Sequence, residues 1–168
     1  MNKLKRYTIK GIIFVIITGS IFHFIYEWSG NNPLVGFLVP INESVWEHMK
    51  LSFFPMLLYA FFMTYKLEAD YPCITSASMI GVLLSTFLIP VFFYTYSGIL
   101  GRTYAFLDIG TFIVSVILSF IAVYKLTISC KLTSYERLFK FIILLAAMCF
   151  FIFTYNPPNI GIFVDPTK

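Results

Sequence analysis

Residues 74–96 read ITSASMIGVLLSTFLIPVFFYTY, a run without any Asp, Glu, Lys or Arg. An α-helix needs about 20 predominantly apolar residues to cross the hydrocarbon core of a bilayer. Four other predominantly apolar runs, each with a few charged residues, occupy residues 8–27, 44–66, 103–125 and 137–155. The pattern predicts an all-α fold, in which residues 1–168 form a single membrane-embedded domain. We expect a polytopic helical bundle with about five transmembrane helices.

The overall composition agrees with this interpretation. Hydrophobic residues make up 59% of the chain and charged residues 12%, whereas a soluble domain carries about 25% charged residues. The net charge of +4 is spread over the connections between apolar runs, so it indicates membrane topology and not nucleic-acid binding. The expected partner of the surface is the lipid bilayer, and the expected location is the cell membrane.

Lysine and arginine are distributed unequally between the two ends of the predicted bundle. One end, which holds the N-terminus and the connections near residues 66 and 125–140, has nine of them, and the other end has three, including Arg102 and Lys168. The positive-inside rule therefore predicts a cytoplasmic N-terminus and, with five helices, an extracytoplasmic C-terminus. The basic N-terminus resembles the start of a signal peptide, but no small-x-small cleavage site follows, so we expect an uncleaved first helix.

Local signals mark the helix ends and bends. Ser44 and Glu47 fit an S-x-x-E capping box, which predicts a helix start after Pro40. Pro55 and Pro90 lie within predicted helices and are expected to kink them. Cys73, Cys130 and Cys149 are far apart without metal-type spacing, so we expect ordinary small apolar residues.

Polar residues gather near the predicted extracytoplasmic end. His23 and Glu27 are four residues apart, as are Glu43 and Glu47, and such pairs share a helix face. Asp108 lies on a stripe of polar residues along the run 103–125, which must face other helices. By depth alone, one pocket is expected to collect the ionisable side chains of His23, Glu27, Glu43, Glu47, His48, Arg102 and Asp108.

Three interpretations of this pocket stay open. Two imidazoles and several carboxylates suit a divalent metal such as zinc, with His23, Glu27, Glu43, Glu47 and His48 as candidate ligands. An activated water there could attack a lipid substrate. Alternatively, the same groups bind a small polar solute or relay protons in a small carrier or a substrate-binding transporter subunit. Finally, they only cap helices and pair with one another, as in a structural membrane protein. Whether the protein is an enzyme is left undecided by these patterns, as is its oligomeric state.

Three motifs carry a resemblance to a known family. Residues 40–50, PINESVWEHMK, resemble P-V-N-E-S-x-W-E-H-x-K, residues 23–28 match H-x-x-Y-E-W, and residues 157–166 match P-P-x-x-x-x-F-x-D-P. These motifs are similar to those of a bacterial family of small integral membrane proteins of unknown function. The resemblance implies the fold and the membrane location, but no activity. It adds Asn42 and Asp165 to the candidate site, because the motifs fall on the same predicted side.

Overall fold

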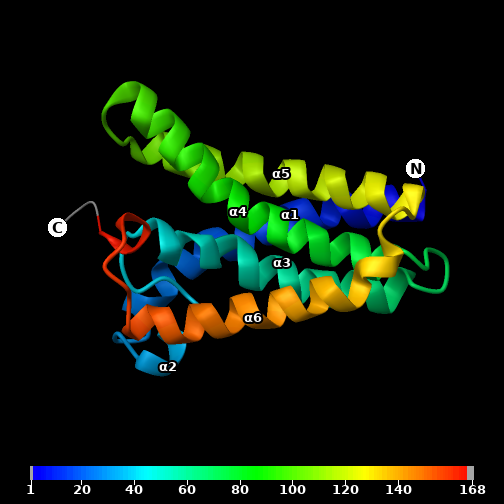
Figure 1. Ribbon diagram of the computed structural model, residues 1–168, viewed down its shortest axis with the longest axis horizontal. Helices are drawn as coiled ribbons and strands as arrows, with labels where there is room; N and C mark the ends of the chain where they lie inside the picture. Colours follow the sequence, from blue (N-terminus) through cyan, green and yellow to red (C-terminus); the bar gives the residue numbers. More distant parts are fainter. Residues whose placement is uncertain (1, 166–168) are drawn as a thin grey trace.

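The computed structural model describes residues 2–165, which form a bundle of helices without any strand (Figure 1). The α-helices are α1 (Lys3–Trp28), α2 (Pro33–Gly36), α3 (Val45–Leu67), α4 (Ile74–Leu100), α5 (Ala105–Ser129) and α6 (Glu136–Tyr155). Two short 3₁₀ helices, η1 (Thr133–Tyr135) and η2 (Gly161–Phe163), flank α6. The all-α prediction is confirmed, and each of the five predicted runs lies largely within one long helix.

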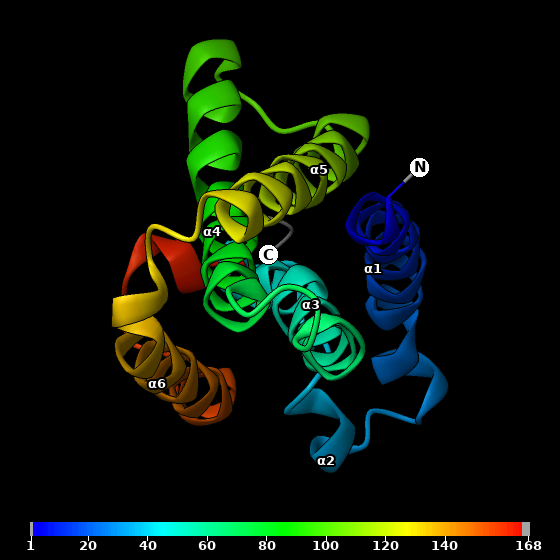
Figure 2. The same cartoon turned by 90° about the vertical axis from the view of Figure 1, so that its right-hand side faces the viewer.

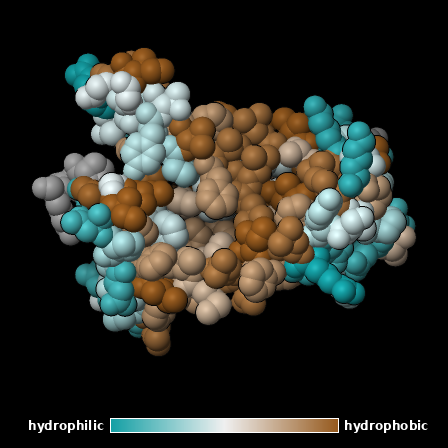
Figure 3. All heavy atoms as spheres, in the orientation of Figure 1, coloured by the Kyte–Doolittle hydropathy of each residue, from teal (hydrophilic) through white to brown (hydrophobic). Residues whose placement is uncertain are grey.

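Four helical segments are long and apolar enough to cross a membrane, namely α1, α4, α5 and the segment Thr133–Tyr155. The remaining long helix, α3, is not one of these four; it carries Glu47 and Lys50 near its start and Lys66 near its end. Figure 3 shows a broad apolar band across the middle of the visible face and hydrophilic residues towards both ends. This distribution is the one expected of a protein that contacts a lipid bilayer.

Helix α3 lies at the centre of the bundle, where it packs against α1 and α4 (Figure 2). Its start follows the predicted capping pattern in part: the Ser44 hydroxyl accepts a hydrogen bond from the backbone N–H of Glu47. The second half of the capping box is absent, because the N–H of Ser44 donates to the side chain of Asn42 instead. The Glu47 carboxylate is thereby left to other partners.

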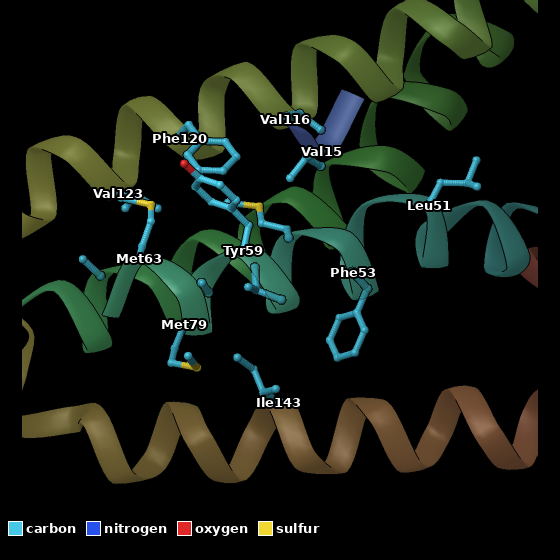
Figure 4. Packing of buried hydrophobic residues seen from close by; sticks show 14 of the residues in the cluster. Val15, Leu51, Phe53, Tyr59, Met63, Met79, Val116, Phe120, Val123 and Ile143 are labelled. Carbon is cyan, nitrogen blue, oxygen red and sulfur yellow. The ribbon is translucent and has the colours of Figure 1, made fainter. Parts of the chain in front are cut away.

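The core is made of side chains from all five long helices (Figure 4). Tyr59 of α3 packs against Phe120 of α5, with ring centroids 5.9 Å apart, and Phe53 packs against Phe150 of α6 at 5.0 Å. Helices in lipid gain little from the hydrophobic effect, so close van der Waals packing must hold them together. Gly19 permits such an approach, since a Cβ at this position would lie 2.5 Å from the carbonyl oxygen of Leu51.

The two ends of the bundle differ. The N-terminal end comprises the start of α1 and residues 68–73 and 130–135, and the C-terminal end comprises residues 29–44, 101–104 and 156–165. Pro90 lies inside a continuous α4, and the C-terminal part of this helix leans away from α3 and α6 (Figures 1 and 2). Two residues of the sequence analysis, Lys168 and Pro166, lie outside the described part of the chain.

A disulfide joins Cys73 and Cys130 at the N-terminal end, with their Cα atoms 5.4 Å apart. The bond links the α3–α4 connection to the end of α5, and Thr133 donates a hydrogen bond to Cys73. The expectation that these cysteines are ordinary apolar residues was wrong, because spacing in the sequence says nothing of a pair brought together by helix packing. Cys149, in contrast, is a free thiol.

Candidate functional site

A cavity of about 430 Å³ lies at the C-terminal end, between α1, α3, α4 and α5. In Figure 3 the surface is hollowed beside the protruding ends of α4 and α5. Its polar lining residues are Ser20, His23, Glu43, His48, Thr103, Asp108 and Thr111. The cavity therefore collects His23, Glu43, His48 and Asp108 out of the predicted site residues.

Three of these side chains form a compact cluster. His23 comes from α1, Glu43 precedes α3, and His48 lies in its first turns. One ligand atom from each lies within 4.8 Å of the others. Nε2 of His48 is 3.4 Å from a carboxylate oxygen of Glu43, and the two imidazole rings have centroids 5.4 Å apart.

The local backbone explains why Glu43 and His48 meet. The Asn42 side chain accepts a hydrogen bond from the N–H of Ser44 at 2.9 Å, which forms a tight turn just before α3. Glu43 lies in this turn and outside the helix, so it does not share the helical face of Glu47 as the four-residue spacing predicted. The turn directs Glu43 towards His48, the residue that follows Glu47.

The protonation of the cluster follows from its neighbours. Nδ1 of His48 lies 3.0 Å from the backbone carbonyl of Ser44, and because a carbonyl only accepts, Nδ1 carries the hydrogen. Nε2 faces Glu43: in the protonated ring it donates to the carboxylate, and in the neutral ring it offers a lone pair that a metal ion can take. Contact with His48 holds the pKa of the Glu43 carboxyl below its ordinary value, against the opposing effects of burial and of the Asp165 charge. Nδ1 of His23 is buried without a hydrogen-bond partner in the described part of the chain.

Asp108 is a second acid in the same cavity. It accepts a hydrogen bond from the hydroxyl of Tyr96 on α4, so the two helices that form the protruding hairpin are joined next to the site. The predicted polar stripe of α5 does face the interior, since Ser115 and Ser119 are fully buried. Tyr96 was missed by the sequence analysis, because nothing in a run of aromatic residues distinguishes it from its neighbours.

Glu47 faces away from the cavity and belongs to a buried ion pair. Its carboxylate is 2.7 Å from Nζ of Lys50, and the two side chains are 2% and 0% exposed. Glu47 also accepts hydrogen bonds from the N–H of Ile41 at 3.0 Å and from the hydroxyl of Thr154 on α6 at 3.1 Å. Lys50 donates further to the carbonyls of Gly36 and Val39. This pair holds α3, α6 and the α2 segment together.

The remaining predicted site residues are not among the residues that line the cavity. Glu27 is exposed at the end of α1, and Arg102 is exposed with its guanidinium 4.8 Å from the ring centroid of Tyr104. Asn42 holds the turn described above. The charge of Asp165 acts on Glu43, so the tail after α6 is close to the cluster, as its motif suggested.

Taken together, the fold and the site define an all-helical protein with four helical segments able to cross a membrane and a cluster of His and Glu side chains at the mouth of a cavity. The chain belongs to DUF6512, a family of unknown function, whose model matches residues 1–168. No curated protein and no solved structure matches the chain.

Proposed function

We propose that this protein is a multi-pass membrane protein that binds a divalent metal ion, with zinc as the best match, through His23, Glu43 and His48. The observation that carries the proposal is the convergence of these three side chains within 4.8 Å. Two imidazole nitrogens and one carboxylate oxygen are a known zinc ligand set, which keeps a fourth position for water or substrate in catalytic sites. Asp108 is a further acid of the same cavity.

The geometry of the Glu43–His48 pair supports a tetrahedral metal. Two ligands of one zinc ion lie about 3.3 Å apart when both bonds are near 2.0–2.1 Å long, and the observed separation is 3.4 Å. Zinc-binding histidines commonly donate their other ring N–H to a backbone carbonyl, which fixes the ring and the tautomer. His48 makes this contact with Ser44.

The decisive measurement is the zinc content and zinc affinity of the protein purified in detergent without added metal. We expect about one zinc per chain, which also raises the unfolding temperature. His48→Ala and Glu43→Gln should each reduce the affinity by at least about tenfold, because a lost ligand leaves an incomplete coordination sphere. Glu27→Gln is the matched control, since this exposed acid lies one turn beyond His23 on α1.

The purely structural interpretation makes the opposite prediction. If the parent protein binds no zinc and no added divalent ion raises its unfolding temperature, the cluster only caps and pairs helices. A loss of affinity in Glu27→Gln as large as in Glu43→Gln would also contradict the assignment of ligands.

The proposed membrane placement has five crossings, including α3. The charges of Glu47 and Lys50 do not prevent α3 from crossing, because they neutralise one another and are enclosed by protein. The excess of Lys and Arg at the N-terminal end supports a cytoplasmic N-terminus in the cell membrane. The cavity and its cluster then face the extracytoplasmic side, and the Cys73–Cys130 disulfide lies on the cytoplasmic side, where cellular thiols reduce disulfides.

Single cysteines in a cysteine-free background test this orientation. Glu27→Cys should react with a membrane-impermeant maleimide in intact cells, and Lys131→Cys should react only after the membrane is permeabilised. Both positions are exposed, at opposite ends of the bundle. The reverse labelling pattern would show that the cavity faces the cytoplasm and that the disulfide lies on the opposite side, in an oxidising compartment.

A further inference from the structure

The cavity is much larger than a metal ion and has two chemically distinct parts. Its volume of about 430 Å³ is in the range of sites for small organic ligands. The ionisable groups Glu43, His48, His23 and Asp108 form its polar part. The other part is lined by apolar side chains that include Phe24, Ile89, Phe93, Ile109 and Phe112.

The apolar part extends from the cluster into the interior of the apolar band. On α1 the lining continues inward from His23 through Ser20 to Gly19, a distance of about 6 Å at 1.5 Å per residue. On α4 it reaches down to Ile89, which is only 4% exposed. A fully polar solute would leave these walls without a partner. An apolar chain would fill them.

The cavity is also continuous with the surface that faces lipid. Ile109 of α5 and Phe24 of α1 line the cavity, yet they are 60% and 48% exposed. Neighbouring residues on the same helices, such as Phe106 and Ile21, are exposed apolar side chains as well. A molecule in the bilayer could therefore enter between α1 and α5 without leaving an apolar environment.

From these features we propose that the cavity takes a single-chain amphiphile from the membrane, with its chain along the apolar walls and an anionic oxygen of its head group on the metal. This inference rests on the proposed metal site. Without a metal, the carboxylates of Glu43 and Asp108 repel an anionic head group. With a divalent ion, the site gains two positive charges and an open ligand position. Binding of the amphiphile must therefore depend on the metal.

Photo-cross-linking in phosphatidylcholine nanodiscs tests the proposal. The probes are a long-chain fatty acid that carries a diazirine and the corresponding lysophosphatidic acid, which distinguish a carboxylate from a phosphate head group. We expect saturable cross-linking to peptides of α1, α4 and α5 in the zinc-loaded protein. Chelation of zinc should reduce the probe affinity measured by cross-linking by at least about tenfold, which is equivalent to about 1.4 kcal/mol of binding free energy.

Two variants of α5 make the test specific. Ile109→Trp fills the cavity and should reduce cross-linking as strongly as chelation does, while zinc binding stays unchanged. Ile117→Trp is the matched control, because Ile117 is an exposed apolar residue two turns along the same helix, outside the cavity lining.

Each outcome decides between the two proposals. If zinc binds but neither probe cross-links saturably, the proposal of an amphiphile in the cavity is wrong and the metal site stands. The same holds if Ile109→Trp and Ile117→Trp change cross-linking to the same extent. Cross-linking that is unchanged by chelation would overturn the contact between the head group and the metal. A protein that binds no zinc would overturn both proposals.

Discussion

Lys50→Met is expected to lower the free energy of unfolding by about 3–5 kcal/mol, because it leaves the charge of Glu47 buried without a partner. Nζ of Lys50 has three hydrogens, and all three have acceptors: Glu47 at 2.7 Å, the carbonyl of Gly36 at 2.9 Å and that of Val39 at 3.4 Å. The substitution therefore also removes the donor for two backbone carbonyls.

Thermal unfolding of the purified protein measures this effect. For a chain of this size, each kcal/mol shifts the midpoint by about 2–4 °C, so the expected decrease exceeds about 6 °C. The double variant Glu47→Gln with Lys50→Met should be more stable than Lys50→Met alone, because no unpaired charge is left in the interior. Recovery in the double variant distinguishes an ion-pair effect from a general packing defect.

A surface pair provides the control for Lys50→Met. Lys140 pairs with Glu136 at 2.6 Å, but the two side chains are 53% and 27% exposed. Exposed ion pairs contribute about 0–1 kcal/mol, so Lys140→Met should leave the midpoint within a few degrees of the parent. Equal losses in Lys50→Met and Lys140→Met would contradict the special role of the buried pair.

Removal of the disulfide is expected to have the second-largest effect on stability. The bond closes a loop over a sequence separation of 57 residues, for which the chain-entropy relation gives about 4 kcal/mol. Compared with the oxidised parent, Cys73→Ser is expected to lower the free energy of unfolding by about 2–4 kcal/mol. The decrease is at the lower end of this range if helices inserted in a membrane already restrict the unfolded state.

Cys149→Ser is the natural control, since Cys149 is a free thiol on α6. A reducing agent should lower the stability of the parent and of Cys149→Ser by similar amounts, and it should not change Cys73→Ser. If the parent is insensitive to reduction, or if Cys73→Ser is as stable as Cys149→Ser, the disulfide contributes nothing to the fold.

The buried pair and two members of the His–Glu cluster, Glu43 and His48, come from the same short motif, residues 40–50. Glu43 and His48 face the cavity, while Glu47 and Lys50 face α6 and the α2 segment. Adjacent residues on an α-helix project about 100° apart, so Glu47 and His48 are directed to different sides of α3. One side of this motif therefore stabilises the C-terminal end, and the other side forms the candidate site.

The sequence by itself determined the elements and their approximate limits. Each long apolar run folds into a helix, the structure in which a single segment satisfies its own backbone hydrogen bonds, and Ser44 marks the start of α3 through a local contact. These are short-range effects, which the sequence displays directly. The gathering of polar residues near one end was visible for the same reason, since helix lengths fix the depth of each residue.

Only the tertiary structure decided which of those residues meet. His23 reaches Glu43 and His48 because α1 packs beside α3 with a particular rotation about its axis, and Gly19 permits that approach. Glu47 lies at the same depth but is directed towards Lys50 and Thr154. Cys73 and Cys130 were likewise paired by helix packing across 57 residues. Depth follows from the position along a helix, but the direction of a side chain depends on how the helices pack against one another.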